Sequence, residues 1–304
     1  MTDGNDKHRA LKQAEAASFG RVAPSFGSLS ERITGPLADA FVEWAEIGAG
    51  DRVLDVGTGT GIVARRAAKI AGATNVVGID LSPAMLREAR SERTEEARPL
   101  RLAAADAERL SFAAGSFDRT LSLFAVSHVP DRAAVAGEMF RVLRRGGTVA
   151  VGVGSGPSRW SLAAVRHAFR VVPERFARAT GRRLDGPGTL VSLVPEGSRR
   201  SRSPAARTTG APVSDWLPRL LRDAGFRDLA TAWVRQVATF ADVGAFWETH
   251  TTFSTPSRDW LAAAPDSEIA DVRGAFERAC RRVLDRGGTL AYPFGALLVG
   301  GRRP

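Results

Sequence analysis

A glycine-rich loop after a short apolar stretch holds the residues whose types and spacing most clearly indicate chemistry. In RVLDVGTGTGIVA (52–64), Gly57, Gly59 and Gly61 alternate with threonines, and Asp55 lies two residues before the first glycine. Glycines in such a turn let backbone N–H groups approach a ligand closely. A dinucleotide loop needs its third glycine three residues after the second, and a phosphate loop needs lysine followed by serine or threonine. The loop has neither pattern, so it predicts a small-molecule site that fits no phosphate-binding fingerprint.

The elements that must position this loop alternate between strand-like and helix-like patterns. Short apolar runs predict strands at 51–57, 75–80, 100–106, 117–126 and 148–154. Apolar residues at helical spacing predict helices at 30–47, 61–72, 82–93 and 132–145, with N-caps at Ser30 and Ser82 and stops at Gly72 and Gly146-Gly147. Strands and helices that alternate in this way form a parallel sheet with right-handed crossovers. The loop is then expected at the carboxyl edge of the sheet, where ligands bind.

The regular alternation ends after residue 154. The sequence then predicts basic amphipathic helices at 158–180, an Arg- and Ser-rich low-complexity segment at 195–212, a helix at 214–226 and a strand at 228–240. Helices are expected over 241–286, with breaks at Pro256 and Pro265, before a last strand at 288–303. We therefore expect a flexible lead-in over 1–29 and one domain over 30–304, with cap or insert segments at about 154–215 and 241–287.

Composition and charge bound the class of protein. The 304 residues are 44% hydrophobic and 25% charged, an ordinary globular mixture. The net charge of +10 comes from cations spread along the whole chain, so an arginine-rich composition explains it better than a nucleic-acid-binding surface. The one cysteine, Cys280, excludes an intrachain disulfide and a cysteine-pair metal site. No apolar run matches a membrane span or a signal peptide, so we expect a cytoplasmic monomer or homodimer.

Five motifs resemble, in order and spacing, those of the class I S-adenosylmethionine-dependent methyltransferases. They are the glycine loop DVGTGTG, VVGIDLSPAML (76–86), AAADAERLSFAAGSFD (103–118), LSLFAVSHVPD (121–131) and EMFRVLRRGGTVAVG (138–152). The stretches at 35–61 and 294–304 are similar to the type 11 branch, typified by ubiquinone and menaquinone biosynthesis. The resemblance implies a Rossmann-like α/β fold, with a seven-stranded sheet whose last strand is antiparallel, flanking helices and a helical substrate cap. It also implies S-adenosyl-L-methionine as the cofactor and a small-molecule methyl acceptor.

The resemblance carries roles over to particular positions. Asp80 matches the acid that accepts hydrogen bonds from both ribose hydroxyls, and Asp106 and Ala107 match residues that meet the adenine amino group and ring edge. Asp55 is expected to orient the loop or, through water, the ammonium group of the methionine part; alternatively, it only caps the turn after its strand. Leu81 and Met85 of the second motif either pack on the adenine or belong to the core. The full set implied to contact the cofactor is Asp55, Gly57, Thr58, Gly59, Gly61, Asp80, Leu81, Met85, Asp106, Ala107 and Phe124.

His128, just after the fourth predicted strand, is the candidate catalytic residue. The resemblance places its segment near the methyl group of the cofactor. An imidazole titrates near neutral pH, so it could deprotonate a phenol or another hydroxyl as a general base. Alternatively, His128 is structural or lines the substrate site, as in many members of the family. His167 and His250, which lie in the two cap segments, are weaker candidates for the same role.

Three functions fit these motifs. The first is O- or C-methylation of an aromatic or apolar biosynthetic intermediate by in-line displacement. Aromatic residues at 19–26, 160–176 and 246–260 favour it, unless they only pack the cap onto the sheet. The second is methylation of RNA or protein, which the net charge and SRRSRSPAAR (198–207) motivate, although the motifs of DNA-base methylation are absent. The third is a cofactor-binding homologue that has lost turnover.

Overall fold

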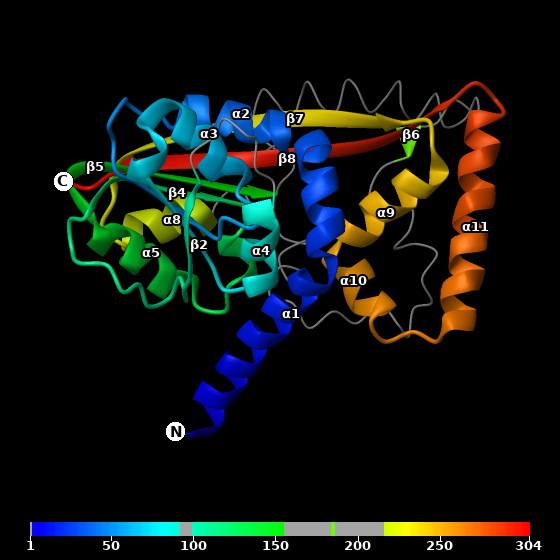
Figure 1. Cartoon of the computed structure of the whole chain (residues 1–304), viewed down its shortest axis with the longest axis horizontal. Coiled ribbons are helices and arrows are strands. Elements are labelled where there is room, and N and C mark those ends of the chain that lie inside the picture. Colours follow the sequence, from blue (N-terminus) through cyan, green and yellow to red (C-terminus); the bar gives the residue numbers. More distant parts are fainter. Residues whose placement is uncertain (1, 92–98, 155–183, 186–215) are drawn as a thin grey trace.

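A mostly parallel sheet forms the centre of the molecule (Figure 1). The computed structural model describes residues 2–91, 99–154, 184–185 and 216–304. Across the sheet the strands are ordered β3-β2-β1-β4-β5-β8, and β7 pairs along β8. Their bounds are Val53–Val56 (β1), Val76–Asp80 (β2), Arg101–Ala104 (β3), Phe117–Leu123 (β4), Leu143–Gly154 (β5), Arg227–Phe240 (β7) and Thr289–Arg302 (β8).

The directions of these strands confirm the predicted sheet. The strands β1 to β5 run parallel to one another. The last strand, β8, is antiparallel to both β5 and β7. A two-residue strand, Leu184–Asp185 (β6), adds a short parallel pairing to β8. The seven-stranded sheet with an antiparallel last strand is therefore present, and β6 extends it beyond the prediction.

Helices cover both faces of this sheet because each strand alternates its side chains between two cores. In β1, Leu54 and Val56 belong to one buried cluster and Val53 belongs to the other. The first cluster is covered by α5 (Arg132–Val142) and α8 (Trp216–Asp223), and the second by α2 (Gly35–Trp44) and α3 (Ile62–Ala71). Figure 1 shows the two helix pairs on opposite sides of the strands.

Shorter elements connect the strands at both edges of the sheet. The helix α4 (Pro83–Ser91) contacts β2 and β3, and the Met85 N–H points to Ser82 Oγ at 3.5 Å, so the predicted N-cap is confirmed. Gly72 ends α3 at a positive φ, as predicted. Two 3₁₀ turns, Ala73–Asn75 and Val126–His128, precede β2 and follow β4.

A helical cap is inserted between β7 and β8. It consists of α9 (Val243–Phe253), α10 (Thr255–Leu261) and α11 (Asp266–Leu284). The predicted breaks are confirmed, because Pro256 lies in the first turn of α10 and Pro265 is the N-cap of α11. These helices share a third buried cluster with the far ends of β7 and β8, and Figure 1 shows them beyond the α/β layers. The predictions for 158–180 and 195–212 lie outside the described residues.

The N-terminal segment differs from the prediction. Residues 1–29 were expected to be a flexible lead-in, but Thr2–Ile33 forms one helix, α1. Its apolar side chains are sparse, and helices of this kind owe their stability to tertiary packing rather than to intrinsic propensity. Leu29 and Ile33 are buried in the cap cluster, which supplies that packing. Ser30 is buried inside α1, so it does not cap the next helix. No described helix, α1 included, combines the length and apolar content of a membrane span.

The end of α5 also differs from the prediction. The helix was expected to reach residue 145 and to stop at Gly146-Gly147, but it ends at Val142, and Leu143 already pairs with Phe117 in the sheet. The register between β4 and β5 shifts just after this pair. Gly146 has a φ of 75°, and a Cβ on Gly147 would lie 2.9 Å from the Asp118 carbonyl oxygen. The two glycines therefore form an irregularity inside β5 rather than a helix stop.

The cap cluster gives a first test of the fold. Phe276 is fully buried and packs on Phe246, Trp247 and His250. We expect Phe276→Ala to lower the free energy of unfolding, measured by urea denaturation, by about 3–5 kcal/mol, because it leaves a cavity in a packed cluster. Val237→Ala, at a side chain that is 42% exposed, should change it by less than about 0.5 kcal/mol. Equal effects of the two substitutions would contradict the buried position of Phe276.

Candidate functional site

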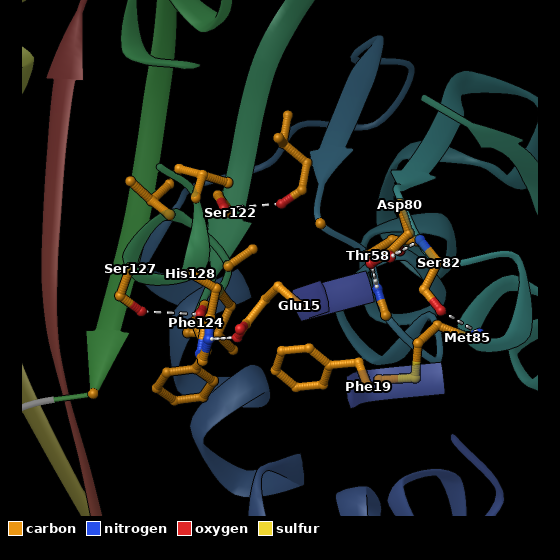
Figure 2. A pocket seen from close by; sticks show the side chains of 18 of the residues that line it. Glu15, Phe19, Thr58, Asp80, Ser82, Met85, Ser122, Phe124, Ser127 and His128 are labelled. Atoms are coloured by element: carbon orange, nitrogen blue, oxygen red, sulfur yellow. Dashed lines mark hydrogen bonds and ion pairs between the residues drawn. The ribbon is translucent and has the colours of Figure 1, made fainter. Parts of the chain in front are cut away.

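A large cavity lies at the carboxyl ends of β1, β2 and β4. Its volume of about 810 Å³ falls in the range of about 300–1,000 Å³ that small-molecule sites occupy. One wall consists of the loops that follow β1, β2, β3 and β4, and the other consists of α1, the cap and parts of β7 and β8. Figure 2 shows this cavity from close by, with the glycine-loop side and the His128 side facing each other across it.

Most of the predicted site residues line this cavity. They are Gly57, Thr58, Gly59, Asp80, Leu81, Met85, Asp106, Ala107, Phe124 and His128. Two predicted cofactor contacts, Gly61 and Asp55, are not among the lining residues. Gly61 is the N-cap of α3 at a φ of 82°, so it shapes the turn into that helix. Asp55 lies beneath the loop, where it is 1% exposed.

The glycine loop is held by its own backbone and by Asp55. The N–H groups of Gly57 and Thr58 both donate to the Ile79 carbonyl, at 2.9 and 2.8 Å. Gly57 has a φ of 71°, and a Cβ there would lie 2.1 Å from the Cβ of Ala125, so only glycine fits. Thr58 Oγ1 donates to Asp55 Oδ2 at 2.6 Å. This contact agrees both with the loop-orienting role and with the turn-capping role predicted for Asp55.

Asp80 presents its carboxyl group at the edge of the cavity. Its two oxygens accept hydrogen bonds from the backbone N–H groups of Gly59, at 2.9 Å, and Ser82, at 2.8 Å. Each carboxylate oxygen can accept a second donor. Burial raises the pKa of Asp80 above its ordinary value, although the hydrogen bonds from these backbone N–H groups act to lower it. The arrangement fits a pair of neighbouring hydroxyls, as in a ribose, and Figure 2 shows Asp80 beside Thr58, Ser82 and Met85.

Asp106 is shared with the N-terminal helix, which the sequence analysis did not anticipate. Lys12 Nζ of α1 lies 2.5 Å from Asp106 Oδ2 and 2.9 Å from a Glu108 oxygen. The other Asp106 oxygen accepts the Glu108 N–H at 3.0 Å. Lys12 also lines the cavity, as do Glu15 and Phe19. Residues 12, 15, 19 and 26 follow helical spacing, which is the signal that would have found this wall.

Phe124 occupies a strained backbone position where β4 leaves the sheet. Its φ of 66° is unusual for a residue other than glycine. Its N–H donates to the Gly152 carbonyl at 2.7 Å, and its ring packs on Phe294, with centroids 5.0 Å apart. Non-glycine residues in this region cluster at functional sites, where the surrounding structure maintains the strain. The next turn of the chain then brings His128 to the cavity.

His128 is held by a carboxylate from α1. Its Nδ1 lies 2.6 Å from Glu15 Oε1, and the two side chains are 21% and 12% exposed. The edge of the Phe19 ring packs on the imidazole, with centroids 5.0 Å apart. Figure 2 shows Glu15 pointing at His128, with Phe19 next to the pair. An imidazole fixed in this way at a cavity wall can accept a proton from a bound molecule.

The other described histidine candidate does not reach the cavity. His250 is fully buried between Phe246, Phe276 and Tyr292. Neither of its ring nitrogens has a hydrogen-bond partner in the part of the chain that the structure describes, and burial lowers its pKa to about 4. His250 therefore packs the cap, and its candidacy as a base is wrong. His167 lies outside the described residues.

Arg258 joins α1 to the cap at the opposite wall. It is 3% exposed and donates to Ser18 Oγ at 3.1 Å, to the Thr252 carbonyl at 2.7 Å and to Thr255 Oγ1 at 3.0 Å. Its guanidinium also lies over the ring of Phe19, 4.2 Å from the centroid. Burial lowers the pKa of Arg258 to about 10, so the group is still a cation at neutral pH.

The glycine-loop end of the cavity has the character of a cation site. Among the described residues, no lysine, arginine or histidine forms an ion pair with Asp55 or Asp80. A Cβ on Gly59 would meet only the end of Met85, at 3.9 Å, so the loop leaves room beside this residue. S-adenosylmethionine carries a sulfonium and an ammonium group together with a ribose diol. The acids and the bare backbone therefore fit this cofactor.

Comparisons with known proteins agree with this site. A family model for the methyltransferase domain matches residues 53–147. Erythromycin 3''-O-methyltransferase of Saccharopolyspora erythraea is 31% identical over 243 residues, which cover 76% of this chain and 68% of that protein. An uncharacterized protein of Mycobacterium tuberculosis is 38% identical over 126 residues, and this match spans 41% of the chain but only 45% of the length of that relative.

A solved structure adds the fold. The [4+2]-cyclase SpnF superimposes with a TM-score of 0.50 at 18% identity, covering 88% of this chain and 81% of that one. Its name assigns a cyclisation rather than a methyl transfer. The likeness therefore concerns the architecture, and the reaction has to be argued from the site.

The buried Asp55 beneath the loop can be tested through the pH dependence of stability. Burial raises the pKa of Asp55 from 3.8 to about 7, so between these values the folded chain holds a proton that the unfolded chain has lost. Protonation of Asp55 in the folded chain therefore stabilises the fold. This stabilisation is complete below pH 4 and is lost as the pH rises through 7, which lowers the free energy of unfolding by up to about 4 kcal/mol. The Asp55→Asn side chain cannot ionise. We expect urea denaturation to show that its free energy of unfolding rises, relative to that of the natural protein, between pH 5 and pH 8. An identical pH dependence in the two proteins would contradict the raised pKa.

Three findings now point the same way. The last strand of the chain, β8, runs antiparallel to β5, the glycine loop lies beside Asp80 and Asp106 at the carboxyl edge, and the erythromycin enzyme matches over more than two thirds of its length. The chain therefore belongs to the class I S-adenosylmethionine-dependent methyltransferases.

Proposed function

We propose that this protein transfers a methyl group from S-adenosylmethionine to a hydroxyl oxygen of a small, largely apolar acceptor. The observation that carries the proposal is the continuity of the cavity, which runs from the glycine loop and Asp80 to an aromatic wall and has His128 in its lining. A site for both reactants in one cavity is what a direct transfer requires. The name of the erythromycin relative, which specifies an oxygen as the methylated atom, supports the choice of a hydroxyl.

The residues divide the cavity into two ends. The glycine loop, Asp80 and Asp106 form the end that suits the cofactor. Aromatic side chains from α1, the cap and the β7–β8 pair form the other end, namely Phe19, Phe26, Trp233, Phe253, Tyr292 and Phe294. Flat, apolar walls with few polar groups suit an acceptor with a ring or an extended hydrocarbon surface.

The chain itself contributes alignment, exclusion of water and a proton acceptor. S-adenosylmethionine supplies, when bound, a methyl group already activated on a sulfonium sulfur. Asp80 and the loop backbone hold the nucleoside, so the orientation of the donor is fixed. Holding two reactants in line is worth effective molarities on the order of 10⁵ M or more. His128 takes the proton that the attacking hydroxyl loses, since a neutral ether forms only when this proton leaves.

Two alternatives give different outcomes in the same assay. The neighbour named a [4+2]-cyclase illustrates that the fold also supports other reactions, so a cofactor-binding homologue without methyl transfer is the second candidate. The lining of the cavity argues against RNA or protein as the substrate, because aromatic side chains from α1, the cap and the β7–β8 pair line the end opposite the glycine loop, and such walls suit a small apolar molecule.

The direct test is methyl transfer to a metabolite extract. The purified chain is incubated with tritium-labelled S-adenosylmethionine and a small-molecule extract, and labelled products are separated by chromatography. We expect label in at least one organic-soluble product. Label only in added RNA or protein would favour a macromolecular substrate. No labelled product at all, despite cofactor binding measured by calorimetry, would favour a homologue without turnover.

The role of Asp80 gives a separate prediction. Asp80→Ala should raise the Kd for S-adenosylmethionine at least tenfold in calorimetry, because each ribose hydroxyl left without an acceptor costs about 1–3 kcal/mol. The control is Asp39→Ala, which removes an exposed carboxylate paired with Arg66 on the outer surface. Its Kd should equal that of the natural protein. A thermal melt checks that both variants are folded, and an unchanged Kd in a folded Asp80→Ala protein would refute the assignment.

A further inference from the structure

We propose that Glu15 of the N-terminal helix is a positioning residue, which fixes the tautomer of His128 so that Nε2 receives the proton of the acceptor. The proposal rests on the proposed function, and it deepens it by assigning the base to a pair of residues. Glu15 lies in α1 and His128 follows β4, so the two residues are 113 positions apart in the chain. The catalytic site is then complete only when α1 is docked.

The geometry of the pair decides which nitrogen is free. Glu15 Oε1 lies 2.6 Å from His128 Nδ1. An ionised carboxylate only accepts hydrogen bonds, so Nδ1 must carry the proton in this contact. Nε2 then keeps its lone pair, and no described residue forms a hydrogen bond with it. Since His128 lines the cavity, this lone pair is the group available to a bound acceptor.

The surroundings of the pair restrict its movement. Phe19, one turn further along α1, packs its ring edge on the imidazole. The guanidinium of Arg258 lies over the Phe19 ring and donates a hydrogen bond of 3.1 Å to Ser18 Oγ. The guanidinium also lies close enough to Glu15 for a favourable electrostatic interaction between opposite charges. The segment of α1 that carries Glu15 is therefore anchored on both sides of the cavity.

The proton step balances without any further reactant. The acceptor oxygen forms a bond to the methyl carbon while the bond from that carbon to sulfur breaks. The O–H bond breaks, and its proton moves to Nε2 of His128. The resulting imidazolium donates from Nδ1 to Glu15, which stabilises the positive charge that has formed. The proton then leaves to water, and the products are a methyl ether, S-adenosylhomocysteine and a proton.

A purely structural reading is that Glu15 only docks α1 onto the sheet. The two readings differ in what they change. A docking contact affects the stability of the helix and the affinity for ligands, whereas a positioning residue affects the tautomer of His128 and the rate of the chemical step. Ser18, on the same helix, offers a matched control because its contact with Arg258 is also a docking contact.

Kinetics provide the first measurement. With tritium-labelled S-adenosylmethionine and the metabolite extract as acceptor, Glu15→Gln should lower the apparent kcat by about 10- to 100-fold. The extract dilution that gives half of the maximal rate should change by less than about threefold, and Glu15→Asp should restore part of the rate. Ser18→Ala, which removes a docking contact but leaves the Glu15–His128 contact, should lower the apparent kcat by less than about threefold. An equal loss in Glu15→Gln and Ser18→Ala would overturn the proposal in favour of docking.

The second measurement needs no acceptor. The chain has four histidines, so ¹⁵N-labelled imidazoles can be resolved by NMR and His128 assigned from a His128→Asn variant. The natural protein should show His128 protonated on Nδ1, and Glu15→Ala should lose this preference. A tautomer that does not respond to Glu15 overturns the proposal. A tautomer that responds, in a chain that methylates nothing, supports the pairing and contradicts the proposed function instead.

Discussion

The close approach of the glycine loop to the turn after β4 is the constraint on which the site depends. Gly57 has no side chain, and the space that a Cβ would need is occupied by Ala125. The loops that follow β1 and β4 therefore touch, and the chain between Ala125 and His128 leaves from a fixed point. The Ile79 carbonyl, which accepts two loop N–H groups, ties the end of β2 to the same place. One contact thus fixes where the glycine loop and the end of β2, which carries Asp80, lie relative to the turn that carries His128.

The two walls of the cavity differ in their buried ionisable side chains. Asp80 lines the glycine-loop wall and Asp55 lies beneath it, and burial raises the pKa of both without a cationic partner among the described residues. The opposite wall contains the buried cation Arg258. Acidic residues at the glycine-loop end agree with family membership, because the cofactor of the family carries a sulfonium and an ammonium group.

The parts of the fold with short-range signals could be predicted from the sequence. Strands, the glycine loop and the caps at Ser82 and Gly72 depend on a few adjacent residues, and they lie where expected. The α1 helix could not be predicted in the same way, because its stability comes from packing on a cap more than 200 positions away. In the sequence, Gly146-Gly147 has the pattern of a helix stop, and only the pairing of Leu143 with Phe117 shows that the two glycines lie inside β5. For the site, Asp80 and His128 were found, whereas Glu15 and Lys12 were missed for the same reason as α1.

The long β7–β8 pair has a consequence for how such a chain diversifies. Phe240 and Leu290 are partners in register, so the two ends of the cap leave the hairpin side by side. Insertions with adjacent ends disturb their host fold little. The three cap helices can lengthen, shorten or be exchanged without moving the strands that hold the glycine loop. The cap can therefore vary between related chains as one unit, while the sheet that carries the glycine loop stays as it is.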